Sequence, residues 1–318
     1  MTAKRLTIFY ASDIHGAERV FRKFLQAAPF YRADAVIFGG DITGKSLVPL
    51  VAVAPGRYRA ELFGTTHEVE SGSSLDGLET RIRNNGFYPY RTTSEEVVLM
   101  RTDPAHLSRV FSGVMAETAT RWVAMADDAL RDAGIPALMM PGNDDEPEVK
   151  RILAQGEWIV DAEGRIVELD GYQVASWGYS TTTPWHSPRE VTEEAMAAAL
   201  DVLLAGLDPA RPAIFNLHDP PNGTGLDLAL KLTPDLRVVV SGGEPQRAPV
   251  GSRSVRAAIE RLRPVLSLHG HIHESRGAAR IGGTIALNPG SVYGEGTLQG
   301  VLVTLEGGKV EGHKFVAG

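Results

Sequence analysis

Side chains able to bind a metal ion follow five short apolar runs of this 318-residue chain. In chain order they are Asp13 and His15, then Asp41, Asn143, His218, and finally His271 and His273. Nitrogen and oxygen ligands of this kind suit Mn, Fe, Zn, Co or Ni ions. The chain has no cysteine, so thiolate ligands and disulfides are excluded. The residues therefore predict a transition-metal site built from imidazole, carboxylate and amide groups.

The spacing of these residues supports a shared site. Asp13 and His15 are two residues apart, as are His271 and His273, and in extended chain such pairs point to the same side. A glycine stands directly before three of the candidates, where it permits a sharp turn and the close approach of a substrate; these are Gly40, Gly142 and Gly270. A lone histidine at a strand end is usually a surface or hydrogen-bonded residue, but five such fragments in series favour a metal site.

The elements that must position these groups alternate between strands and helices. Short apolar runs bounded by Gly, Pro or Asp predict buried strands at 6–10, 35–38, 137–140, 173–177, 213–217, 238–240 and 265–268. Helical patterns intervene at 17–27, 104–133, 193–205 and 255–262, and the tail at 300–316 predicts a hairpin around Gly307 and Gly308. This alternation predicts an α/β fold, in which ligands collect beyond the carboxyl ends of the strands.

One segment interrupts the alternation. We interpret residues 1–318 as a single domain that carries an insertion at about 51–101, a segment rich in Tyr, Gly, Thr and Arg. Its seven acids outnumber its six arginines, so it is not a basic nucleic-acid patch. We favour a solvated surface subdomain. The alternative is a lid or a dimer contact near the site, and a homo-oligomer is compatible with the sequence.

Composition limits the partners. Acidic residues outnumber basic ones by 39 to 32, and the net charge of -7 disfavours nucleic-acid polymers and anionic membranes. No apolar stretch is long enough to span a bilayer, and the first residues lack the pattern of a secretion signal. We therefore expect a cytoplasmic protein that acts on a small molecule.

The ordered motifs D-x-H, G-D, G-N-x-D, a lone His and G-H-x-H resemble those of the calcineurin-like metallophosphoesterases, over residues 13–273. The resemblance implies two stacked mixed sheets flanked by helices, with two divalent or trivalent metal ions at the sheet edge. It implies that Asp13, His15 and His273 hold the first ion and that Asn143, His218 and His271 hold the second. Asp41 would bridge them. The segments HDPPNGTGLD, GHIHES and IALNPGS resemble a bacterial and archaeal branch of predicted phosphoesterases.

The sequence departs from the family pattern at Asp144. Where the family has a histidine that binds phosphate and protonates the leaving group, this chain reads Gly142-Asn143-Asp144-Asp145. An ionised carboxylate there repels phosphate, so Asp144 helps catalysis only if it is protonated or turned away from the site.

The mechanism that we expect uses a hydroxide bridging the two metal ions to attack a phosphoester. We assign catalytic roles to Asp41, Asn143 and Asp144, and substrate contacts to Gly142, Asn143 and His218. A phosphodiesterase or a broad phosphoesterase acting on small molecules is the favoured function. A phosphomonoesterase, including a protein phosphatase, is the first alternative. A non-catalytic interaction module is the second, although every metal ligand of the family pattern is retained.

Overall fold

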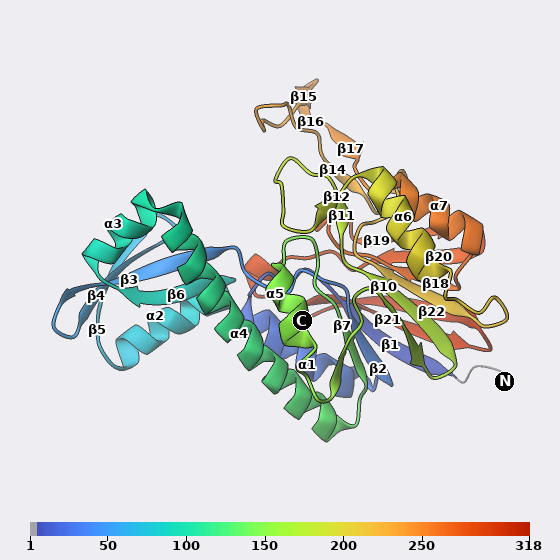
Figure 1. Cartoon of the computed structure of the whole chain (residues 1–318), viewed down its shortest axis with the longest axis horizontal. Helices are drawn as coiled ribbons and strands as arrows, with labels where there is room; N and C mark the ends of the chain where they lie inside the picture. Colours follow the sequence, from blue (N-terminus) through green and yellow to red (C-terminus); the bar gives the residue numbers. More distant parts are fainter. Residues whose placement is uncertain (1–4) are drawn as a thin grey trace.

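Two six-stranded mixed sheets form the centre of the protein, in a computed structural model that describes residues 5–318 (Figure 1). The first has the order β22 (Lys309–Ala317), β21 (Gln299–Glu306), β1 (Leu6–Ala11), β2 (Ala35–Phe38), β7 (Ala137–Met139) and β8 (Ile159–Asp161). The second has the order β19 (Gly277–Ile281), β20 (Thr284–Asn288), β18 (Leu266–Leu268), β13 (Ala213–Leu217), β10 (Tyr172–Trp177) and β9 (Arg165–Leu169). Four neighbouring strands of each sheet are parallel, β1-β2-β7-β8 in the first and β20-β18-β13-β10 in the second.

The sheets stack face to face because their strands alternate in side-chain direction. Leu6, Ile8 and Tyr10 of β1 point inward and share one buried apolar cluster with Val174 of β10 and Ile214 of β13. The residues between them on β1 point outward, toward the helices. Each sheet is thus buried on both faces, which explains why its strands read as continuous apolar runs.

Helices cover the two outer faces. On the first sheet lie α1 (Glu18–Tyr31), α4 (Pro104–Ala133) and α5 (Pro147–Leu153); on the second lie α6 (Glu193–Leu204) and α7 (Arg253–Leu262). The predicted start of α4 is confirmed, because the side chain of Asp103 accepts hydrogen bonds from the backbone N–H groups of Ala105 and His106. The predicted fold class, two stacked mixed sheets flanked by helices, is confirmed. Among residues 5–318, no helix combines the length and the apolar character needed to cross a membrane.

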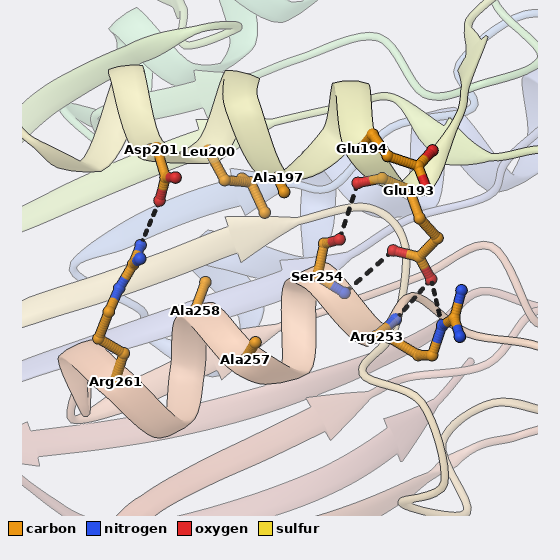
Figure 2. Close-up of a pocket in the computed structure, with 10 residues that line it drawn as sticks. All are labelled: Glu193, Glu194, Ala197, Leu200, Asp201, Arg253, Ser254, Ala257, Ala258 and Arg261. Atoms are coloured by element: carbon orange, nitrogen blue, oxygen red, sulfur yellow. Dashed lines mark hydrogen bonds and ion pairs between the residues drawn. The ribbon is translucent and has the colours of Figure 1, made fainter.

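Figure 2 shows how α6 and α7 are joined across a shallow groove of about 350 Å³. The carboxylate of Glu193 accepts hydrogen bonds from the backbone N–H groups of Arg253 (2.7 Å) and Ser254 (3.0 Å), at the first turn of α7. Asp201 and Arg261 form an ion pair at the other end of the groove. The carboxylate of Glu193 therefore compensates the positive end of the α7 dipole.

Residues 46–102 form a separate subdomain beside the two central sheets (Figure 1). Its sheet has the order β5 (Thr65–Glu70), β4 (Arg57–Leu62), β3 (Ser46–Ala54) and β6 (Phe87–Thr92), and its helices are α2 (Ser73–Asn84) and α3 (Ser94–Thr102). Leu50 and Ile82 are fully buried in a core that belongs to this subdomain alone. Helix α4 leaves the subdomain and runs on along the first sheet, so one rigid element joins the two parts.

The prediction of a buried strand at 238–240 is wrong. Val238 and Val240 are 41% and 58% exposed, on an arm that projects from the second sheet. The arm contains β14 (Leu228–Leu230), β15 (Val240–Ser241), β16 (Glu244–Pro245) and β17 (Arg247–Pro249). Gly242 and Gly243 turn the chain back at once, and this apolar run pairs with nearby segments, Val238 with Leu232 and Val240 with Pro245. The remaining short elements are β11 (Ser180–Thr181), β12 (Glu190–Val191) and η1 (Tyr293–Glu295). The hairpin predicted at the tail is confirmed as β21 and β22.

A core substitution tests how α4 is anchored. The ring of Trp122 stacks on Phe21 of α1, with centroids 4.1 Å apart and an interplanar angle of 5°. We expect Trp122→Ala to lower the free energy of unfolding by about 3–5 kcal/mol, because it leaves a cavity between α4 and α1. Val202→Ala on α6, where Val202 is 80% exposed, is the control and should change it by less than about 0.5 kcal/mol. Equal effects of the two variants in urea unfolding would contradict this packing.

Candidate metal centre

Side chains that follow the ends of β1, β2, β7, β13 and β18 converge at one place on the edge of the stacked sheets. They form two groups, and within each group the potential ligand atoms lie within 4.8 Å of one another. The first group is Asp13, His15 and His273, and the second is Asp41, His218 and His271. The structure therefore brings together residues that are up to 260 positions apart, with His15 and His273 in one group and His218 and His271 in the other.

Asp41 belongs to the second group and also lies close to His15 of the first. Its Oδ2 atom is 3.5 Å from Nε2 of His15 and 3.4 Å from Nε2 of His218. Asp13 completes the arrangement, because its Oδ1 is 3.4 Å from Nε2 of His273 and 3.9 Å from Nε2 of His218. A carboxylate in the position of Asp41 can offer an oxygen to each of two neighbouring cations.

The donor set fits metal ions. The Nε2 atoms of His15 and His273 lie 3.0 Å apart, and Nδ1 of His15 is buried with no hydrogen-bond partner among the described residues. Two imidazole nitrogens and a carboxylate facing one point form a site for a cation that accepts nitrogen and oxygen ligands. We conclude that the residues present can hold metal ions.

Hydrogen bonds outside the two groups orient the ligands. Nδ1 of His218 bonds the carbonyl oxygen of Gly39 at 2.7 Å, which leaves Nε2 directed at the centre. That Nε2 lies 3.0 Å from Oδ1 of Asn143, so the side-chain oxygen of Asn143 belongs to the second group as well. The amide nitrogen of Asn143 donates to Asp144 at 3.1 Å. The backbone N–H of His271 donates to the carboxylate of Asp13 at 3.0 Å, which ties the two groups together.

The four histidines differ in protonation. Burial lowers the pKa of His15 to about 4 and also lowers the pKa of His271, so both are neutral at pH 7. Burial acts in the same direction on His218 and His273, but nearby carboxylates outweigh it. Asp41 and Asp13 raise the pKa of His218 to about 10, and Asp13 raises that of His273. His218 is therefore protonated at pH 7, and a metal ion that binds there would displace this proton.

The backbone is strained at this centre. Asp13, His15, Asp41 and His271 all have positive φ angles, of 57°, 45°, 56° and 66°, which are uncommon for residues other than glycine. The prediction that Asp13–His15 and His271–His273 lie in extended chain is therefore wrong, because the backbone turns sharply at these pairs. The side chains still converge, and backbone strain of this kind clusters at functional sites.

A second buried carboxylate joins two of the ligand loops. Asp145 is fully buried and accepts hydrogen bonds from the backbone N–H groups of Ile42 (3.0 Å), Thr43 (2.8 Å) and Gly142 (2.8 Å). The loops also pack closely, since a Cβ atom on Gly142 would lie 2.1 Å from Oδ1 of Asp41. Gly142 therefore serves loop packing, and its contact with a substrate remains a prediction.

Asp144 is ionised and has partners of its own. Lys45 forms an ion pair with its Oδ2 atom, and the hydroxyl of Ser187 donates to its Oδ1 atom. Burial works against the charge, but Lys45 and Ser187 outweigh it and lower the pKa of Asp144. Asp144 also lies within reach of His15 and Asp41, as a third group that could hold a metal ion. The carboxylate therefore carries no proton to donate at neutral pH.

Several residues of the site were missed in the sequence. Lys45 and Asp145 stand in the same loops as Asp41 and Asn143, which was a usable signal. Ser187 was assigned no chemistry, and nothing near it in the sequence points to Asp144.

Tyr293 covers the ligands, with its ring 4.9 Å from that of His15. Arg189 is buried in an ion pair with Glu163 and donates its backbone N–H to the carbonyl oxygen of Asn143.

The remaining candidates have plainer roles. His269, next to the G-H-x-H motif, is fully buried and is hydrogen-bonded to Ser267 at 2.8 Å and to the carbonyl oxygen of Leu217 at 2.8 Å, so it is a packed histidine of the sheet. Glu274 is exposed, and no hydrogen bond of its side chain is seen among the described residues.

Asp145→Asn tests whether this residue holds the ligand loops in place. The substitution turns one acceptor oxygen into an N–H donor that faces backbone donors, so we expect metal affinity to fall about 10–100-fold. Metal content after dialysis against defined free metal measures this, with circular dichroism as the check of folding. Asp34→Asn near the start of β2, outside the two groups, is the control. Unchanged metal affinity in Asp145→Asn would show that the loops hold their geometry without it.

Comparisons with known proteins agree with this fold. No family model matches the chain. A protein of Methanocaldococcus jannaschii, MJ1162, is described as uncharacterized and is 30% identical over 154 residues, which are 48% of this chain and 62% of that protein. The crystal structure of TT1561 of Thermus thermophilus aligns over 95% of this chain and 99% of its own, with 17% identity and a TM-score of 0.51. A structure described as a novel archaeal phosphodiesterase aligns at 10% identity over 98% and 99% of the chains, with a TM-score of 0.37. The likeness to TT1561 shows a shared fold.

Proposed function

We propose that this protein is a metal-dependent phosphoesterase of the calcineurin-like type that hydrolyses small phosphoesters, phosphodiesters above all. The observation that carries the proposal is the position of Asp41, whose Oδ2 atom lies about equally far from His15 and His218, one in each ligand group. Two cations sharing a carboxylate suit phosphoryl transfer, in which negative charge builds up on several oxygens at once.

Asp13, His15 and His273 would hold one metal ion, Asn143, His218 and His271 would hold the other, and Asp41 would serve both. The two histidine groups and the 3.0 Å distance between Asn143 and His218 support this assignment. When bound, the metal ions supply a water of lowered pKa and neutralise the charge of the phosphate. The chain contributes the buried surroundings, which strengthen the electrostatic interactions of the site with a bound phosphate. The aromatic ring of Tyr293 covers the site beside His15.

Lys45 supplies the positive charge that the family histidine would otherwise bring to this part of the site. Partial burial opposes its charge, but the pairing with Asp144 raises the pKa of Lys45, so it stays protonated. A lysine with a raised pKa is a weak acid, and we propose that it acts by attracting the phosphate and not by donating a proton. Esters with good leaving groups are therefore the expected substrates.

Asp41→Asn tests the proposed function. The change removes one of two carboxylate oxygens from a position between both ion sites, so we expect turnover of bis(4-nitrophenyl) phosphate to fall at least about 100-fold, with loss of bound metal. The matched control is Asp76→Asn, at a carboxylate that is 69% exposed on the subdomain. Near-normal turnover in Asp41→Asn at full metal occupancy would refute the proposal.

A double-mutant cycle tests Lys45. Lys45→Gln leaves the carboxylate of Asp144 uncompensated beside the phosphate, so we expect kcat/KM to fall about 10²–10³-fold. In Lys45→Gln/Asp144→Asn both charges are absent, and activity should recover in part, because the two residues act as a pair. Additive losses in the double variant would show that Lys45 and Asp144 contribute independently.

A further inference from the structure

A groove of about 650 Å³ opens beside Lys45, between the subdomain and the first turns of α4. Its walls come from three elements that Figure 1 shows together at the subdomain, namely β3, α3 and α4. The volume lies within the range of small-molecule pockets. Of the residues given a catalytic role above, Lys45 alone lines this groove.

The lining of the groove has a definite chemical character. Apolar side chains dominate it, including Leu47 and Pro49 of β3, Met100 of α3, and Leu107 and Phe111 of α4. The charged residues that line it are Lys45 and Arg101, and no acidic side chain takes part. In a protein whose net charge is -7, a groove with two cations and an apolar wall is complementary to an anion that carries a hydrocarbon group.

Lys45 links the groove to the metal centre. This residue lines the groove and pairs with Oδ2 of Asp144, which in turn lies 3.9 Å from Nδ1 of His15. Lys45, Leu47 and Pro49 alternate along the chain at the start of β3, so they point to the same side of the strand. A ligand held at the centre can therefore extend past Lys45 along the apolar wall.

The wall is also tied to the loop that carries Asp41. Phe111 packs edge-on against Tyr88, with ring centroids 5.8 Å apart. The hydroxyl oxygen of Tyr88 accepts a hydrogen bond of 2.8 Å from the backbone N–H of Gly44, next to Lys45. This chain of contacts sets the groove in a fixed relation to the site.

We infer that the substrate is a phosphoester with an apolar arm, and that the groove of Leu47, Pro49, Met100, Leu107 and Phe111 binds this arm while the phosphate lies at the metal centre. The inference rests on the proposed function and narrows it to amphiphilic small phosphoesters. It also gives the subdomain a role, because β3 and α3 supply one side of the groove. Arg101 at the groove then adds a positive charge for further anionic groups of the ligand.

The experiment uses linear alkylphosphonates from methyl to hexyl, which present one phosphate-like group and one arm. Their binding to the metal-loaded full chain is measured by calorimetry, at concentrations where they are monomeric. Full burial of one methylene tightens binding about fourfold. The groove is open and Leu107 is partly exposed, so each methylene of the arm is buried only in part. We therefore expect the hexyl compound to bind at least about tenfold more tightly than the methyl compound.

Two matched variants test the wall. Leu107→Gln places an amide where the arm would pack and keeps a good helix former, so we expect it to flatten the dependence on chain length. Val98→Gln changes an apolar residue that is 59% exposed on α3 outside the groove, and it should keep the wild-type dependence.

The outcomes separate this inference from the proposed function. Affinity that does not change with chain length, or no binding of any phosphonate, overturns the inference. If bis(4-nitrophenyl) phosphate is cleaved in that case, the proposed function still stands. If no ester is cleaved with any metal while the chain-length effect and its loss in Leu107→Gln are present, the groove is supported and the phosphoesterase is not.

Discussion

The carboxylate of Asp41 faces imidazoles of two ligand groups within a buried centre, and most of the surrounding structure serves to keep it there. Burying charged groups is costly unless opposite charges or hydrogen bonds compensate them. In this protein the compensation is built from both sheets, since His15 follows a strand of the first and His218 a strand of the second. Neither sheet alone could form the centre, so the stacking of the sheets is a condition for the site.

The loops that carry the ligands show how this condition is met. Positive φ angles at four of the ligand positions place side chains where a regular strand could not. The strain is held by the surroundings: Asp145 collects backbone donors from two loops, and glycines allow those loops to touch. A metal ion that binds to such an arrangement meets ligands that are already oriented, which lowers the cost of ordering them.

Much of the fold and of the candidate ligand set could be predicted from the sequence, because five short buried strands are each followed within a few residues by a side chain that can bind a metal ion. The limits have physical reasons. Residues 238–240 are as apolar as a core strand, but whether a run is buried depends on a partner strand that local sequence does not reveal. The left-handed turns at Asp13 and His271 are only weakly signalled by the residue types, because Asp and His are enriched in this conformation but mostly adopt others. The role of Lys45 depends on its ion pair with Asp144, a residue about 100 positions away that only folding brings into contact. The groove next to Lys45 is likewise formed by segments distant in sequence.

The number of metal ions bound per chain tests the central claim most directly. Metal-free protein would be titrated with Mn²⁺, Zn²⁺ or Co²⁺ at equilibrium, and the bound metal would be counted by elemental analysis together with anomalous scattering from crystals. We predict two ions per chain, one among Asp13, His15 and His273 and one among Asn143, His218 and His271, with Asp41 in contact with both. A single ion at saturation, or two ions without Asp41 between them, would contradict it.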